Sequence, residues 1–212
     1  MSSIDFDERI NVLLDLDQTL IAAVPIVKDE DDDEEEEDQY YDFGKHKKKA
    51  RLFDFENMDD YYIIFQRPNL QEFLDYLFAN FNVSVWTAAS KDYALFIVDK
   101  ILLIKPERQL DYIFFNYHCT ISSKVTGYTK SLKMLWEVYK DDKYNKNNTL
   151  IIDDYDEVCE TQPYNCIPIE PFHFTKKNSQ NDEFLINLIK KLENLKKDNI
   201  IGNKEFANVF KL

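Results

Sequence analysis

The chain has 212 residues, of which 40 are acidic and 26 basic, so its formal net charge at pH 7 is −14. We therefore expect no direct nucleic-acid partner, because affinity for nucleic acid comes largely from cationic neutralisation of phosphates. The 44% hydrophobic content is ample for the core of a single domain spanning residues 1–212. With only three glycines, the sequence contains no glycine-rich nucleotide-binding loop.

The cysteines and the apolar runs bear on the compartment. Cys119, Cys159 and Cys166 are odd in number and lack Cys-x-x-Cys spacing. We expect them to be buried, apolar-like thiols in a reducing compartment, and to form neither a disulfide framework nor a zinc site. There is no signal peptide and no apolar run of transmembrane length, so we expect an intracellular location, nucleus or cytoplasm, and no membrane partner. The sequence leaves the oligomeric state open.

Residues 11–16 form the first predicted strand. Their continuous apolar character is typical of a strand buried on both faces, as in a parallel sheet. Two carboxylates, Asp15 and Asp17, lie at its end, where open α/β sheets bind ligands and where a buried acid needs a cation or hydrogen bonds. In so acidic a chain an Asp-x-Asp also arises by chance, so its interpretation as a site depends on the segments downstream.

Residues 24–60 break the compositional pattern and form a small charged insertion. Residues 29–38 are ten consecutive acids, and without them the rest of the chain carries only −4. Like charges repel and bury nothing, so we expect this run to be disordered and dispensable for chemistry. The basic run at 45–51 has three open interpretations: a solvated surface, a charge partner of the acidic run, or a nuclear-localisation patch.

Beyond the insertion, apolar runs alternate with helical periodicity. This alternation predicts right-handed crossovers and a doubly wound, three-layer α/β/α sandwich with a mainly parallel central sheet. The expected strands are 61–65, 82–86, 112–115, 149–152 and 166–169, and the expected helices begin after Arg67-Pro68 and span 91–103, 130–139 and 182–197, with a short helix in 203–212.

Chemically useful side chains follow several of these elements. Asp15 and Asp17 follow the first strand, Thr87 follows strand 82–86, Lys130 begins a helix, and Asp153-Asp154 ends strand 149–152. A nucleophilic carboxylate, a hydroxyl, an ammonium and a further acidic pair suit phosphoryl transfer, which needs charge neutralisation, in-line positioning and a proton donor.

Each of these residues also has an ordinary structural interpretation. A threonine after a strand is often a helix N-cap, a single lysine on a helix is often solvated, and Asp-Asp can begin a turn. Their joint occurrence in one order, each on a suitable element, favours a site.

Five segments carry a family resemblance: residues 14–20, 67–73, 86–94, 128–132 and 151–155. They resemble the haloacid-dehalogenase superfamily and, more narrowly, the Fcp/Scp-type phosphatases of the RNA polymerase II carboxy-terminal domain. The resemblance covers roughly residues 10–197. It implies the fold expected above and a phosphoric monoester hydrolase.

The resemblance also implies roles for individual residues. Asp15 would be the nucleophile that forms an aspartyl-phosphate, and Asp17 would protonate the leaving oxygen and then activate water. Thr87 and Lys130 would hold the phosphoryl group. Mg²⁺ would be bound by Asp15, by the backbone carbonyl of Asp17 and by Asp154.

Asp153 would then be a neighbour of the Mg²⁺ site. The residue types agree with this assignment, because Mg²⁺ prefers oxygen ligands and two adjacent carboxylates are hard to hold together without a cation.

The chain departs from the family at Asn116, where members usually carry an arginine that belongs to peptide recognition. Recognition of the polymerase carboxy-terminal domain is therefore open. An aromatic-rich flank could pack in the core or line a phosphopeptide pocket; it consists of Phe53, Phe55, Tyr61, Tyr62 and Phe65.

Our expectation is a Mg²⁺-dependent protein serine/threonine phosphatase that acts on a phosphoprotein or phosphopeptide through an aspartyl-phosphate. Two alternatives are a phosphatase for small metabolites and a catalytically silent binding module with the same fold. The charged insertion is a poor candidate for the sealed cap that small substrates often require, and the set of chemical residues argues against a silent module.

Overall fold

A computed structural model describes residues 9–26, 43, 46–59, 61–198 and 200–210. Its central sheet has five strands in the order β6-β5-β1-β7-β8, and every neighbouring pair is parallel. The strands are β1 (Asn11–Leu14), β5 (Asn82–Trp86), β6 (Leu110–Phe114), β7 (Thr149–Asp153) and β8 (Cys166–Pro168). The predicted parallel sheet is confirmed.

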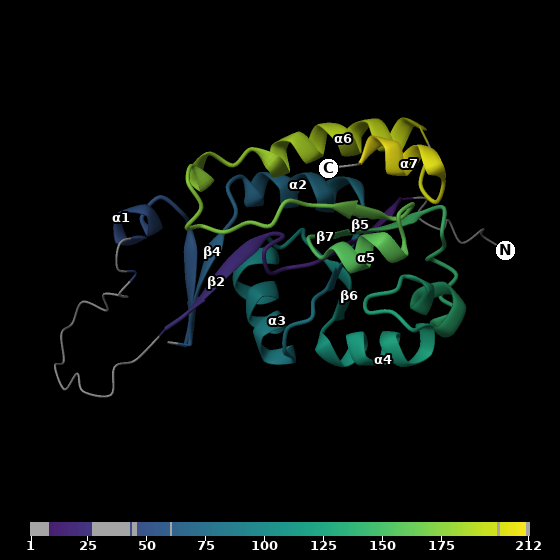
Figure 1. Cartoon of the computed structure of the whole chain (residues 1–212), viewed down its shortest axis with the longest axis horizontal. Helices are drawn as coiled ribbons and strands as arrows, with labels where there is room; N and C mark the ends of the chain where they lie inside the picture. The colour runs from purple at the N-terminus through teal and green to yellow at the C-terminus, as the bar shows by residue number, and fades with distance from the viewer. Residues whose placement is uncertain (1–8, 27–42, 44–45, 60, 199, 211–212) are drawn as a thin grey trace.

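Helices cover both faces of this sheet. Val12 and Leu14 belong to the larger core cluster, with α2 (Leu70–Asn80), α3 (Lys91–Ile97), α6 (Phe184–Asp198) and α7 (Lys204–Val209). Leu13 belongs to the opposite cluster, with α4 (Asn116–Thr126), a π-helix (Met134–Tyr139) and α5 (Asp156–Thr161). In Figure 1, α2, α6 and α7 lie on one side of the sheet and α4 on the other. The doubly wound, three-layer expectation is confirmed.

The insertion and the residues on either side of it form regular structure of which only strand 61–65 was predicted, and that strand does not join the parallel sheet as expected. A second, antiparallel sheet in the order β2-β4-β3 stands beside the central one (Figure 1). Its strands are β2 (Ile21–Pro25), β3 (Phe55–Met58) and β4 (Tyr62–Gln66), and a short helix α1 (Lys47–Ala50) precedes β3. The acidic run at 29–38 lies outside the described residues.

Aromatic packing explains why part of the insertion is ordered. Phe53 and Phe65 are buried with Phe172 and Phe174 from the segment after β8. The rings of Phe65 and Phe174 stack with centroids 4.1 Å apart. These phenylalanines therefore belong to a core, whereas the other aromatic residues of the flank, Phe55, Tyr61 and Tyr62, are exposed.

Several helices differ from their predicted extents. Helix 91–103 is α-helical to Ile97 and continues as a π-helix (Val98–Leu102), and predicted helix 130–139 begins only after Ser131. Besides α1, two further α-helices of the described residues were not predicted: α4, whose sequence is largely polar, and α5, which has six residues. Within the described ranges, no helix is long and apolar enough to cross a bilayer.

The expectation of three free cysteines is wrong for two of them. Cys159 and Cys166 form a disulfide, with Cα atoms 5.0 Å apart, while Cys119 is free and buried. Cys159 lies on α5 and Cys166 begins β8, so the turn between these elements brings the sulfurs together. Sequence spacing alone could not show this contact, because α5 was not recognised.

The Arg67 side chain joins three separate segments. It is 2% exposed and donates hydrogen bonds to the carbonyls of Thr19 and Glu170, at 3.1 and 3.0 Å. It also forms a 2.9 Å ion pair with Asp182, just before α6. Arg67 thus links the loop after β1, the segment after β8 and the approach to α6, all beside the carboxyl edge of the central sheet.

We predict that Arg67→Ala lowers the free energy of unfolding by about 3–5 kcal/mol. The substitution leaves the carbonyl oxygens of Thr19 and Glu170 and the carboxylate of Asp182 without their cationic partner. Urea unfolding would measure the change. Lys105→Ala is the matched control: it removes an ion pair to Asp75 in which both side chains are well exposed, so it should cost under about 1 kcal/mol. Equal losses for the two variants would contradict the account of Arg67.

Candidate active site

The sheet order gathers the predicted residues at one edge. β1 lies between β5 and β7, with Leu14 in register with Val85 and Ile152. Asp15 follows β1 directly, and Thr87 follows β5. Because all three strands run parallel, their carboxyl ends meet there, which is the edge at which open α/β sheets bind ligands.

Asp153 and Asp154, at the end of β7, complete the edge. Asp15 and Asp153 are 5% and 1% exposed, and Asp154 is half-buried. The backbone N–H of Asp15 donates to the carbonyl of Ile152 at 3.0 Å, which fixes the position of Asp15 against β7. The structure therefore brings these three acids together.

Lys130 reaches the same site from a segment that is distant from Asp15 in the sequence. It lies in the turn between α4 and the π-helix, with a left-handed φ of 52°. Its ammonium donates to Asp15 at 2.5 Å and to Asp153 at 2.8 Å. Lys130 is 4% exposed, so the interpretation of a solvated lysine is wrong.

Burial and charge compete at these groups. Burial alone would lower the pKa of Lys130, but the carboxylates of Asp15 and Asp153 outweigh it and raise the pKa. Burial raises the pKa of Asp153, and the neighbouring Asp15 adds to the rise. Lys130 is therefore held in its charged form between the two acids.

Asp15, Asp153 and Asp154 form a cluster that could hold a cation. One carboxylate oxygen from each lies within 4.8 Å of the others. Asp154 also accepts a hydrogen bond from the Thr19 hydroxyl at 3.4 Å, and burial raises its pKa. Three carboxylates face one ammonium, so a divalent cation with a preference for oxygen would balance the excess negative charge.

Asp17 occupies a different environment from this cluster. Its carboxylate accepts a 2.5 Å hydrogen bond from the Tyr93 hydroxyl, at the start of α3. Burial raises the pKa of Asp17 to about 6, despite the Tyr93 hydrogen bond. A carboxyl with a pKa near neutrality suits proton transfer. That Asp17 contributes its backbone carbonyl to a metal stays a prediction.

Thr87 is buried, and its hydroxyl accepts a hydrogen bond from the backbone N–H of Ala89 at 3.1 Å. It is not the N-cap of α3; Ser90 is, and its hydroxyl accepts from the N–H of Tyr93. The capping interpretation of Thr87 is therefore wrong. Asn116, the first residue of α4, is exposed, and its backbone N–H donates to the carbonyl of Ala89.

Two residues that contribute to the site, Tyr93 and Thr19, were not predicted from the sequence. Tyr93 reads as an apolar member of its helix, and Thr19 as part of the Asp-x-Asp segment without a role of its own. Their contacts join residues 76 and 135 positions apart in the chain, so no local pattern could have revealed them.

Solved structures similar to this one include two of Fcp1. One is titled fission yeast RNA polymerase II CTD phosphatase Fcp1-R271A bound to beryllium fluoride, with a TM-score of 0.53 and 21% identity. The other is titled Fcp1, an essential RNA polymerase II CTD phosphatase, with a TM-score of 0.54 and 19% identity. The matches cover 91% and 96% of this chain but only 53% and 58% of the Fcp1 chains. They show the fold.

Closer sequence relatives come from viruses. A protein described as putative CTD phosphatase-like protein 355R of Invertebrate iridescent virus 6 is 45% identical over 182 residues, which cover 84% of this chain and 94% of the relative. Its counterpart in Invertebrate iridescent virus 3 is 38% identical over 193 residues, covering 87% and 96%.

The family model for NLI interacting factor-like phosphatases matches residues 10–201, which include every strand and every acid of the site. The chain therefore belongs to the NLI interacting factor-like phosphatase family and is a phosphoric monoester hydrolase.

Proposed function

We propose that this phosphatase hydrolyses phosphoserine or phosphothreonine in a protein substrate, with Mg²⁺ bound, through an aspartyl-phosphate on Asp15. The observation that carries the proposal is the position of the Asp15 carboxylate, 2.5 Å from the Lys130 ammonium and within 4.8 Å of Asp153 and Asp154. A nucleophile beside fixed positive charge is what phosphoryl transfer requires.

The donor set fits Mg²⁺. Asp15, Asp154 and the backbone carbonyl of Asp17 would hold the ion, and waters would complete its shell. When bound, the ion supplies positive charge close to the phosphate oxygens. The other positive charge comes from Lys130, which Asp153 orients through its 2.8 Å contact.

In the first step a carboxylate oxygen of Asp15 attacks phosphorus, and the bond from phosphorus to the serine or threonine oxygen breaks. Asp17 gives its proton to that leaving oxygen. Lys130 and the Thr87 hydroxyl bind the phosphoryl oxygens as their charge develops.

In the second step water replaces the alcohol. Asp17, now ionised, takes a proton from the water as its oxygen attacks phosphorus. The bond between phosphorus and Asp15 breaks, which releases phosphate and restores both carboxyls to their starting states. Tyr93 holds the Asp17 side chain through both steps by its hydroxyl.

Exposed aromatic surface supports a peptide substrate. Tyr62 of β4 packs edge-on against Tyr93, with ring centroids 5.7 Å apart, and Tyr93 in turn contacts Asp17. Tyr61, next to Tyr62, is 69% exposed. These tyrosines, which directly follow the insertion, thus offer an aromatic surface beside the proton donor, where an extended chain could lie.

Asn116 indicates that peptide recognition here differs from that of the wider family. Its side chain, at the start of α4, replaces an arginine there with a neutral amide. The viral relatives are named CTD phosphatase-like, and Fcp1 is titled a CTD phosphatase. We propose the same substrate class, a phosphoprotein, with peptide contacts that depend on the aromatic surface of Tyr61 and Tyr62.

We predict that Asp17→Asn slows turnover by about 10²–10⁴-fold, the usual contribution of general acid–base catalysis. The loss should be larger for alkyl phosphates than for aryl phosphates, because good leaving groups need less protonation. Steady-state kinetics on both classes would measure it. Equal loss on both would assign Asp17 a structural role.

The same substitution tests the electrostatics without activity. The pKa of Asp17 is about 6 in the folded protein against 3.8 ordinarily, so its ionisation disfavours folding above about pH 6 and has no effect below about pH 4. In chelator, Asp17→Asn should stabilise the protein at pH 8 by up to about 3 kcal/mol, since each pKa unit is worth about 1.4 kcal/mol.

At pH 4 the variant and the parent should unfold alike. Thermal unfolding at the two pH values provides the comparison. If the variant were destabilised equally at the two pH values, ionisation of Asp17 would not lower the stability of the folded protein.

Metal dependence is tested by titration. We expect turnover of an aryl phosphate to stop in excess chelator and to return with Mg²⁺. Asp154→Ala should raise the Mg²⁺ concentration needed for half-maximal rate while leaving the unfolding transition nearly unchanged, because Asp154 is only half-buried. Full activity in chelator would refute the requirement.

Substrate class is tested by comparing kcat/KM for phosphoserine-proline peptides with sugar phosphates and nucleotides at fixed Mg²⁺ and salt. We expect the peptides to be preferred, because Tyr61 and Tyr62 offer an exposed aromatic surface. A small metabolite that wins by about a hundredfold, roughly 2.7 kcal/mol of transition-state binding, would replace the protein-phosphatase proposal with the metabolite alternative.

A further inference from the structure

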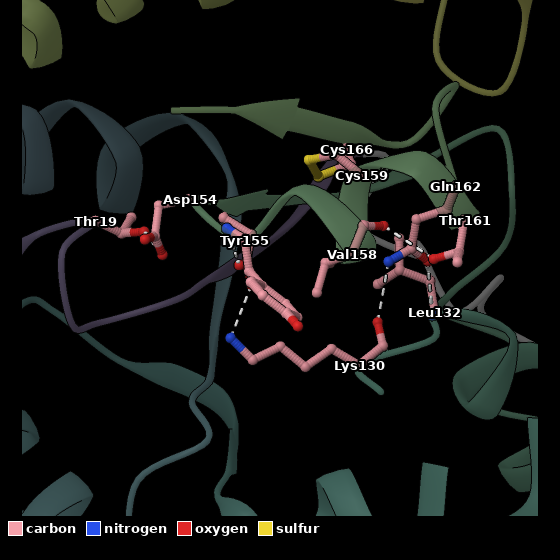
Figure 2. Close-up of a disulfide and its surroundings, with 11 residues drawn as sticks. Thr19, Lys130, Leu132, Asp154, Tyr155, Val158, Cys159, Thr161, Gln162 and Cys166 are labelled. Carbon is pink, nitrogen blue, oxygen red and sulfur yellow. Dashed lines mark hydrogen bonds and ion pairs between the residues drawn. A yellow bond between two sulfur atoms is a disulfide. The ribbon is translucent and has the colours of Figure 1, made fainter. Parts of the chain in front are cut away.

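The side chain of Gln162 forms two hydrogen bonds with the backbone around Lys130. The Gln162 amide donates a hydrogen bond to the carbonyl of Lys130 at 3.0 Å and accepts one from the N–H of Leu132, also at 3.0 Å. Figure 2 shows this amide facing the Lys130 backbone from the end of α5. Both polar ends of the glutamine are therefore used on a single turn.

A second side chain holds the same turn from α4. The buried Ser122 hydroxyl donates to the carbonyl of Tyr128 at 2.7 Å and accepts from the N–H of Ser131 at 2.9 Å. Ser122 thus binds on either side of Lys130, whereas Gln162 binds Lys130 itself. Without the Gln162 side chain, the turn would keep the Ser122 hydrogen bonds but lose both hydrogen bonds from Gln162.

The turn needs such support because of its conformation. Lys130 has a left-handed φ of 52°, which residues other than glycine adopt uncommonly and at an energetic cost. The direction of the Lys130 side chain, and so the place of its ammonium between Asp15 and Asp153, follows from that conformation. Small displacements of groups that position a substrate have large effects on rate.

Gln162 in turn depends on a short, covalently closed segment. It lies three residues after Cys159 and four before Cys166, inside the loop that their disulfide closes. Helix α5 has only six residues, too few to be stable on its own, so it needs outside constraints. In Figure 2 the disulfide lies across α5 from Lys130.

We propose that Gln162 is a positioning residue for Lys130, and that the Cys159–Cys166 disulfide keeps its amide in place, so that reduction weakens phosphate binding. Reduction by a dithiol would break the S–S bond, give a thiol at each cysteine and oxidise the dithiol to its own disulfide. The inference rests on the role proposed above for Lys130 in binding the phosphoryl group.

The first test compares Gln162→Ala with Gln162→Glu and with the control Gln71→Ala. Gln71 is also half-buried, and its amide donates to the Gln66 side chain and to the carbonyl of Ile101, neither of which belongs to the site. The glutamate keeps the acceptor for Leu132 but loses the donor to Lys130. The measurements are kcat and KM for an aryl phosphate, the inhibition constant of inorganic phosphate, and the melting temperature.

We expect both Gln162 variants to raise the inhibition constant of inorganic phosphate and to lower kcat/KM, each by about tenfold or more. The Mg²⁺ requirement should not change. Gln71→Ala should lower the melting temperature and leave the phosphate constant alone. A Gln162→Ala protein that loses only stability, with the phosphate constant of the parent, would overturn the positioning role.

The second test addresses the disulfide. Thiol titration of the denatured parent should find one thiol without reductant and three with it. The parent treated with dithiothreitol, and a Cys159→Ser/Cys166→Ser variant with or without it, should show the weakened phosphate inhibition of Gln162→Ala. Three thiols in the untreated protein, or a reduced parent with unchanged phosphate inhibition, would overturn the part assigned to the disulfide.

The parent itself separates this inference from the proposed function. A parent that neither hydrolyses aryl phosphates nor binds inorganic phosphate would contradict the proposed function. An active parent, inhibited by phosphate to the same degree as Gln162→Ala, would contradict only the inference about Gln162.

Discussion

The ammonium of Lys130 lies between the carboxylates of Asp15 and Asp153, and the arrangement of the site depends on that contact. All three groups are almost fully buried, so each would be costly without its partners. The contact requires that β1 lies beside β7 and that the turn after α4 brings Lys130 to the ends of these two strands. The strand order and the path of the chain after α4 together place the Lys130 ammonium against Asp15, the acid proposed as nucleophile.

The parts of the site that lie on strands could be predicted from the sequence. Asp15, Thr87 and Asp153 follow apolar runs whose length and composition indicate buried parallel strands, and parallel strands place their carboxyl ends together. Lys130 could be suggested only by its order in the chain and the family resemblance. Its predicted helix begins later, and its left-handed backbone has no signal in the local sequence.

The rest could not be predicted, for reasons of range and composition. Tyr93, Thr19 and Gln162 act through side-chain contacts to residues distant in the chain, and nothing local distinguishes them. Helix α4 is too polar, and helix α5 too short, to show a clear apolar period. Because α5 was not predicted, the disulfide between Cys159 of α5 and Cys166 was not predicted either. Of the second sheet only strand 61–65 was predicted, because charge dominates the insertion that precedes it. The order of that sheet comes from phenylalanines that pack against the segment after β8.

The central claim is that Asp15 carries the phosphoryl group, and trapping that adduct is the most direct measurement. The protein would be mixed with an aryl phosphate and Mg²⁺, quenched in acid within the first turnover and digested for mass spectrometry. We expect a phosphate adduct on the peptide that contains Asp15, reducible by borohydride at that residue, and absent from Asp15→Asn. Turnover by Asp15→Asn within about tenfold of the parent, or an adduct on another residue, would contradict it.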